Sequence, residues 1–120
     1  MTGNRSIGQE WVIDASGCDA SVLKDPRLLA GVFEELIVTL KLNVVGAPQW
    51  HVFPAPGGVT GLALLSESHL AIHTFPEHRY AALSIYSCKP REPLDFSALL
   101  QRHLKATAVM VRSLAREAKP

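Results

Sequence analysis

The chain has 120 residues, of which 48% are hydrophobic and 19% are charged, and this length suits one domain, residues 1–120, with a core of its own. Twelve basic and eleven acidic side chains leave a formal net charge of +1 without a Lys/Arg-rich patch, which argues against nucleic acid or an acidic membrane surface as a partner. We therefore expect a small-molecule ligand, and the apolar content predicts that some surface is buried between subunits.

The N-terminal segment MTGNRSIGQE is polar and lacks the apolar region of a signal peptide. No later apolar run reaches the roughly 18 residues of a membrane-spanning helix, so we expect a cytoplasmic protein with no membrane partner. In that compartment the two cysteines, Cys18 and Cys88, are expected to be free thiols, either buried or reactive.

The first half of the chain predicts a strand, a helix and an irregular strand. Residues Glu10–Ala15 form the first strand, and Pro26 follows Asp25 as a helix start with its capping residue. The helix is expected to bury one apolar face, made of Leu28, Leu29, Val32, Phe33, Leu36, Ile37 and Leu40. Residues Asn43–Phe53 predict an irregular strand, and the prolines and glycines of Pro54–Gly58 predict a loop.

The second half predicts four strands and one helix. Three strands at Val59–Leu65, His69–Phe75 and Arg79–Ser87 are separated by short connections, which imply antiparallel neighbours. Leu94–Lys105 predicts a helix that buries Phe96, Leu99, Leu100 and Leu104, and Ala106–Leu114 predicts a last strand. The pattern indicates an α+β, two-layer α/β sandwich with an antiparallel sheet and both helices on one face. A second copy of the sheet is the natural cover for its other face.

Polar side chains gather in and around the predicted strand His69–Phe75, in LLSESHLAIHTFPEHRY (Leu64–Tyr80). His69, His73 and Glu77 are spaced as metal ligands on a helix would be, but Ile72, Thr74 and Phe75 favour a strand and Pro76 stops a helix, so we expect no metal. Ser68 lacks the G-x-S-x-G elbow of a serine hydrolase, and the chain lacks the phosphate cup of a pyridoxal phosphate enzyme. A plain hairpin turn, with serines bonded to their own backbone, is the structural alternative.

The joint pattern resembles a known family. GVTG, ESHLAIHTFPE and YAALSIYSC, in this order and spacing, are similar to G-V-S-G, E-S-H-x-x-I-H-T-W-P-E and Y-A-A-x-D-x-x-T-C-G of bacterial and archaeal S-adenosylmethionine decarboxylases. The similarity extends to GQEWVIDASGCD and HVFPAPGG and covers nearly the whole chain. It implies that family's fold, with the sheets of two subunits stacked in a homodimer.

The resemblance implies a proenzyme that cuts itself at Glu67-Ser68. The hydroxyl of Ser68 attacks the carbonyl of Glu67, and the resulting ester eliminates and hydrolyses to leave a covalent pyruvoyl group. The products are a β chain of residues 1–67 and an α chain of residues 68–120. The pyruvoyl ketone forms a Schiff base with the substrate amine and withdraws the electrons that decarboxylation leaves behind.

Roles for further residues come from the same resemblance. Cys88 corresponds to the acid that reprotonates the substrate carbon, and a free thiol, whose ordinary pKa is about 8.5, is mostly protonated at neutral pH. His73 corresponds to the base of the elimination step, and Thr60 replaces a serine whose hydroxyl assists the cut. Regular strand alternation puts His73 on the face opposite Ser68 and puts Cys88 in another strand, so a bulge or movement of the cut end is expected to bring them together.

The substrate-binding residues implied by the resemblance are Glu77, Phe53 and Phe75. Glu77 corresponds to the acid that binds the ribose diol, and its two oxygens suit two vicinal hydroxyls. Phe75 replaces a tryptophan, and either phenylalanine could hold the adenine or the sulfonium; the alternative for both is a place in the core.

Four positions depart from the family pattern and leave the substrate open: His78, Arg79, Ser84 and Lys89. S-adenosylmethionine, with spermidine biosynthesis downstream, is our first expectation because Glu77 is retained. A pyruvoyl-dependent L-ornithine or L-arginine decarboxylase is the alternative, although two added cations and a lost acid do not favour a dicationic substrate. An unprocessed paralogue that regulates a partner subunit is the non-enzymatic alternative.

Overall fold

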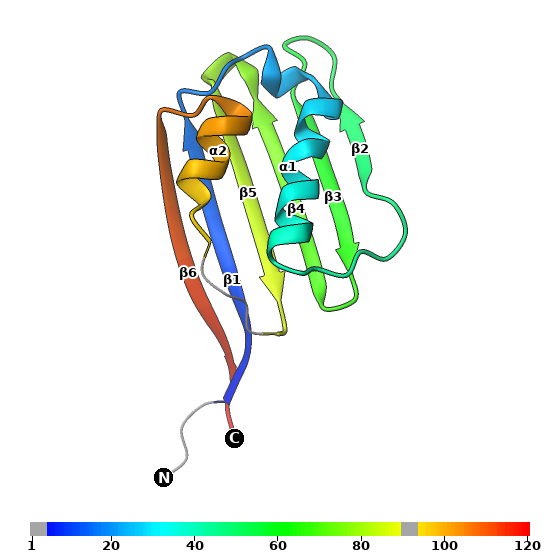
Figure 1. Cartoon of the computed structure of the whole chain (residues 1–120), viewed down its shortest axis with the longest axis vertical. Helices are drawn as coiled ribbons and strands as arrows, with labels where there is room; N and C mark the ends of the chain where they lie inside the picture. Colours follow the sequence, from blue (N-terminus) through cyan, green and yellow to red (C-terminus); the bar gives the residue numbers. More distant parts are fainter. Residues whose placement is uncertain (1–4, 90–93) are drawn as a thin grey trace.

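The computed structural model describes residues 5–89 and 94–120, which form one six-stranded antiparallel sheet with two α-helices on the same face (Figure 1). The α+β fold predicted from the sequence is confirmed. The strand order is β2-β3-β4-β5-β1-β6. The strands are β1 (Arg5–Ser16), β2 (Gln49–Val52), β3 (Val59–Leu65), β4 (Ser68–Phe75), β5 (Tyr80–Ser87) and β6 (Ala108–Ala118); the helices are α1 (Pro26–Thr39) and α2 (Phe96–Leu104), with 3-10 turns η1 (Val22–Lys24) and η2 (Pro76–His78).

Helix α1 begins as the sequence predicts. The side chain of Asp25 accepts a hydrogen bond of 2.9 Å from the backbone N–H of Arg27, and Pro26 occupies the first turn. The predicted face is buried at Leu29, Val32, Phe33, Leu36 and Leu40. Leu28 was predicted to share that face and does not, since it is 49% exposed. It lies about 100° around the helix from Leu29, beyond the strip that the sheet covers.

Helix α2 buries the four side chains predicted for it: Phe96, Leu99, Leu100 and Leu104. Its N-terminus is capped by Asp95, which accepts from the backbone N–H of Ala98 at 3.0 Å. Glu35 of α1 joins the helices by contacts with Arg102 at 2.6 Å and His103 at 2.7 Å. One aromatic pair ties each helix to the sheet, Phe33 with Trp50 at 4.9 Å and Trp11 with Phe96 at 5.6 Å between ring centroids.

Three predicted strands have clearly different bounds in the structure. β1 begins at Arg5 rather than Glu10 because it pairs with β6 along its whole length, and β6 extends to Ala118 rather than Leu114. The segment Asn43–Phe53 contains a strand only at Gln49–Val52, with an isolated bridge between Val44 and Leu65. Gly46, with a φ of +74°, interrupts the extended backbone between them.

The sheet has one covered and one open face. Helix-facing residues of the central strands are buried, whereas the open face exposes Leu62 and Leu64 of β3 and Phe75 of β4, at 47%, 59% and 41%. Over β1 and β6 the open face instead carries the ion pairs Asp14–Arg112 and Glu10–Arg116, at 2.8 and 2.9 Å. Among residues 5–89 and 94–120, neither helix covers this face (Figure 1). In the same residues, no helix combines the length and apolar character needed to cross a bilayer.

Candidate active site

The peptide bond between Glu67 and Ser68 lies where the turn of the β3–β4 hairpin meets β4. The side chain of Glu67 is only 3% exposed, and both of its carboxylate oxygens accept hydrogen bonds from Asn43, one from the backbone N–H at 2.8 Å and one from Nδ2 at 3.1 Å. The hydroxyl of Ser66 donates to the second oxygen at 2.9 Å. A buried carboxylate requires such donors, so these contacts hold the residue before the candidate cleavage site in place.

The carbonyl of Glu67 and the hydroxyl of Ser68, the two groups that self-cleavage would use, also have hydrogen-bond partners. The backbone N–H of Cys88 donates to the carbonyl oxygen of Glu67 at 3.0 Å, which is the oxygen that becomes negatively charged when a nucleophile attacks the carbonyl carbon. The hydroxyl of Ser68 lies 3.1 Å from Nδ1 of His69. The turn thus has an N–H group that donates to the Glu67 carbonyl and an imidazole beside the Ser68 hydroxyl. This arrangement is suited to intramolecular attack by Ser68.

Five of the predicted site residues share one cavity at the opposite end of the hairpin. The cavity has a volume of about 510 Å³ and is lined by Phe53, Thr60, His73, Phe75 and Glu77, together with the Pro54–Pro56 loop. Thr60 and His73 are register partners on β3 and β4, and Thr60 Oγ1 lies 3.3 Å from His73 Nδ1. The hairpin therefore brings the two predicted processing residues Thr60 and His73 together.

The two phenylalanines lie outside the hydrophobic core. Phe53 is 49% and Phe75 is 41% exposed, which contradicts the alternative that they are core residues. Phe75 stacks on Tyr80 with centroids 5.7 Å apart, and Phe53 meets His51 edge-on at 4.6 Å. Glu77, in the turn η2, lines the same cavity. Two aromatic rings and one carboxylate suit a ligand with a flat ring and polar groups.

The structure does not bring Ser68 to His73 within one subunit. They are five positions apart along β4, or roughly 16 Å at about 3.3 Å per residue. Of the two expected ways of bringing them together, the bulge is absent, because β4 pairs with β3 and with β5 in unbroken register from Ser68 onward. Movement of the cut end stays a prediction. Cys88, the first residue after β5, lies at the Ser68 end. The site residues thus form two groups at opposite ends of β4.

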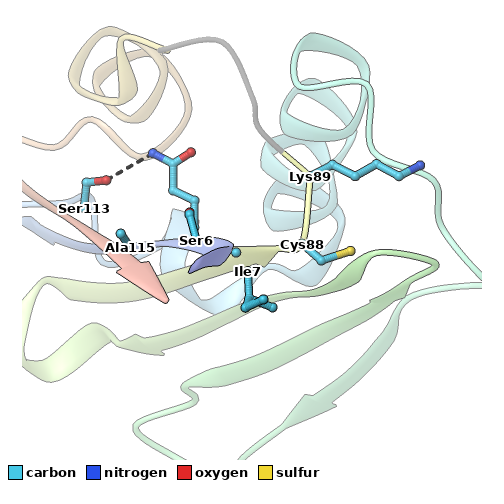
Figure 2. Close-up of a pocket in the computed structure, with 8 residues that line it drawn as sticks. Ser6, Ile7, Cys88, Lys89, Ser113 and Ala115 are labelled. Atoms are coloured by element: carbon cyan, nitrogen blue, oxygen red, sulfur yellow. Dashed lines mark hydrogen bonds between the residues drawn. The ribbon is translucent and has the colours of Figure 1, made fainter. Parts of the chain in front are cut away.

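A second, smaller cavity of about 190 Å³ lies at the Cys88 end (Figure 2). Cys88 and Lys89 line it together with Ile7 and Gln9, and Gln9 donates a hydrogen bond to Ser113 at 3.1 Å. Both cysteines are free, as the sequence predicts. Cys18 is buried, which raises its thiol pKa to about 11, whereas Cys88 is exposed. The exposed thiol is the one suited to chemistry with a ligand.

Two neighbours of the candidate cleavage site, His69 and Asn43, have no processing role in the prediction from the sequence. His69 adjoins Ser68, so its position was a usable signal. Asn43 is 24 residues from Glu67, and nothing in the sequence links them.

The helix that a metal site would need is not formed, because His69 and His73 lie on strand β4. No group of three or more His, Cys, Asp or Glu in the part of the chain that the structure describes is placed to hold a metal ion.

The four departures from the family pattern lie outside the larger cavity. His78, Arg79, Ser84 and Lys89 are absent from its described lining. Ser84 pairs with Ala71 in the middle of the open face, and Lys89 lines the smaller cavity. Arg79 adopts a left-handed conformation, with a φ of +51°, at the end of η2. These four departures therefore lie outside the wall of the larger cavity, in which Thr60 and Phe75 replace the serine and tryptophan of the family pattern.

Comparisons with known proteins point to the family that the sequence pattern resembles. The sequence profile of the S-adenosylmethionine decarboxylase family matches residues 9–117. "S-adenosylmethionine decarboxylase proenzyme 2" of Halalkalibacterium halodurans is 38% identical over 117 residues, which are 96% of this chain and 90% of that protein. The proenzyme of Pyrococcus furiosus is 36% identical over 95 residues, 76% of this chain and 67% of that protein.

A solved structure supports the fold. The adenosylmethionine decarboxylase of Aquifex aeolicus superposes with a TM-score of 0.80 and covers 97% of this chain and 95% of its own. Its sequence identity is 24%, so this likeness bears on the architecture alone.

Proposed function

The chain belongs to the S-adenosylmethionine decarboxylase family, and on that premise we propose that it cuts itself at Glu67-Ser68 and then decarboxylates S-adenosylmethionine with a covalent pyruvoyl group. The observation that carries the proposal is the single cavity that gathers Phe53, Thr60, His73, Phe75 and Glu77. The product, decarboxylated S-adenosylmethionine, is the aminopropyl donor expected for spermidine biosynthesis.

The larger cavity favours S-adenosylmethionine over ornithine or arginine. Glu77 is the only acid in its described lining, and its two oxygens can accept hydrogen bonds from both hydroxyls of a ribose. The exposed faces of Phe53 and Phe75 suit an adenine ring and a sulfonium cation. Ornithine and arginine have no ring that would use two aromatic walls, and this difference is the basis of the preference.

The turn at Glu67-Ser68 supports formation of the pyruvoyl group. The donor on the Glu67 carbonyl and the imidazole beside the Ser68 hydroxyl suit conversion of the peptide bond into an ester. Elimination of the Glu67 carboxylate and hydrolysis would then leave residues 1–67 and 68–120. The ketone at position 68 supplies an electron sink for decarboxylation. Cys88, exposed beside it, would donate the proton that replaces carbon dioxide.

The separation of Ser68 from the larger cavity supports a homodimer of processed αβ protomers. If two open faces stack about a two-fold axis that crosses the strands at the middle of β4, the Ser68 end of one subunit lies opposite the Phe75 end of its partner. The exposed Leu62 and Leu64 lie on the face that this contact covers. Each active site would then combine Ser68 and Cys88 of one subunit with the larger cavity of the other.

Denaturing mass spectrometry of the purified protein tests the proposal, with one portion treated with a carbonyl-reactive reagent. Fragments 1–67 and 68–120, with a ketone on the second, are expected, and the Ser68→Ala variant should stay intact. Release of carbon dioxide from S-adenosylmethionine, ornithine and arginine is then measured in parallel. Activity only on an amino acid would replace the substrate assignment. A wild-type chain that stays intact after long incubation would favour the regulatory paralogue.

A further inference from the structure

His69 is the imidazole in contact with the nucleophile of the proposed cut. Its Nδ1 lies 3.1 Å from the Ser68 hydroxyl, which is within the distance over which a base can take a proton. His73, the histidine that the family pattern ties to processing, is instead paired with Thr60 at the far end of β4. The two histidines are four residues apart on a strand, and so they serve different ends of the hairpin.

The orientation of the His69 ring is fixed by its surroundings. His69 faces Leu64 on β3 and Tyr86 on β5 in the sheet register. Its ring meets that of Tyr86 edge-on, at 88° with centroids 6.0 Å apart, and the guanidinium of Arg116 lies over the same tyrosine ring at 5.5 Å. A ring held in this way presents one nitrogen to the serine, which is the requirement for a positioned base.

We propose that His69 is the catalytic base of the first processing step, the conversion of the Glu67-Ser68 peptide bond into an ester; this rests on the function proposed above. With the imidazole proton on Nε2, Nδ1 accepts the proton of the Ser68 hydroxyl as Oγ attacks the carbonyl carbon of Glu67. The N–H of Cys88 stabilises the resulting oxyanion. The C–N bond then breaks, and the imidazolium returns the proton to the amine of Ser68, so the step is an isomerisation.

The two histidines divide the reaction in this scheme. His69 acts before the ester forms, whereas His73 acts on the ester, in the elimination that releases the Glu67 carboxylate. A variant blocked at the first step keeps an ordinary peptide bond. A variant blocked at the second accumulates an ester, which hydroxylamine cleaves to give a hydroxamate at Glu67 and an unmodified serine N-terminus at residue 68.

The experiment follows cleavage of freshly made full-length chain by intact-mass analysis, with and without hydroxylamine. His69→Gln keeps a hydrogen-bonding side chain, and His69→Phe keeps an aromatic ring against Tyr86, but neither can carry the proton. His73→Ala reports on the second step, and His78→Gln, which changes an exposed histidine outside both cavities, is the matched control. Thermal melting shows whether each variant is folded.

We expect both His69 variants to be folded and to process at least about 100-fold more slowly than wild type, the size of a general-base contribution, while hydroxylamine leaves them intact. His73→Ala should yield the hydroxamate, and His78→Gln should behave as wild type. Processing of either His69 variant within about three-fold of wild type, or an ester accumulating in either, would overturn the assignment. If wild type itself is never cut, the proposed function fails, and the role of His69 fails with it.

Discussion

The backbone N–H of Cys88 donates a 3.0 Å hydrogen bond to the carbonyl oxygen of Glu67, across the boundary between β5 and the β3–β4 hairpin. Cys88 therefore offers two groups with separate uses. Its backbone N–H donates to the carbonyl that self-processing would attack, and its thiol is exposed and free to act as a proton donor.

Replacing the Cys88 thiol should separate processing from decarboxylation. Cys88→Ala keeps the backbone N–H on the Glu67 carbonyl, so we expect fragments 1–67 and 68–120 to form at close to the wild-type rate. Turnover of S-adenosylmethionine should fall about 100-fold or more, because the proton donor is missing. Intact mass measures the first effect and carbon dioxide release the second. A variant that stays uncut would show that the thiol, rather than the amide, supports the cut.

Removing the side chain of Asn43 should weaken the contacts that hold Glu67 in place at the proposed cleavage site. Asn43→Ala loses the 3.1 Å bond from Nδ2 to Glu67 but keeps the backbone donor. Loss of a hydrogen bond to a buried carboxylate costs about 1–3 kcal/mol, so we expect the free energy of unfolding to fall by that amount and processing to slow several-fold. Chemical denaturation of uncut protein and intact-mass kinetics measure the two effects. Gln49→Ala, an exposed amide on β2, is the control, and equal rates in both variants would contradict the prediction.

Mixed dimers can test whether two subunits build each active site. Ser68→Ala forms no pyruvoyl group, and Glu77→Gln should raise KM about ten-fold or more because a carboxylate that binds two hydroxyls is lost. In a co-expressed mixed dimer, the Ser68 of one subunit and the Glu77 of the other would complete one intact site. We expect a wild-type KM at up to half of the wild-type activity. If each subunit holds its own complete site, no mixed dimer has an intact one, and the low KM will not return.

The contact of Glu35 with Arg102 and His103 predicts a loss of stability in acid. The hydrogen bond from Arg102 and, to a smaller extent, the one from His103 lower the pKa of the Glu35 carboxyl from 4.5 to about 2. Because the folded protein holds the ionised form more strongly than the unfolded chain does, this stabilisation is complete above about pH 4.5 and is lost as the pH falls through about 2. Glu35→Gln should therefore melt below wild type at pH 7, and the difference should shrink between pH 4.5 and 2. A difference that is constant with pH would contradict this cause.

Elements with a clear local signal were predictable from the sequence. Helix α1 starts at a capping aspartate followed by proline, and the strands β3, β4 and β5 have the alternating pattern and short connections of an antiparallel sheet. Local pattern failed where long-range pairing decides the outcome. β1 and β6 extend beyond their predicted ends because each completes the hydrogen bonds of the other, and Leu28 is exposed because the sheet covers only part of the apolar helix face.

The sequence by itself determined the family, the α+β architecture and the residue types of the site, since motif spacing and apolar periodicity are properties of the chain alone. Only the tertiary structure decided which of those residues meet. It joined Asn43 to Glu67 and the Cys88 amide to the Glu67 carbonyl, and it paired His73 with Thr60 at the far end of β4 from Ser68. The physical reason is that an extended strand holds residues five apart at roughly 16 Å, while strand pairing brings distant segments into hydrogen-bond contact.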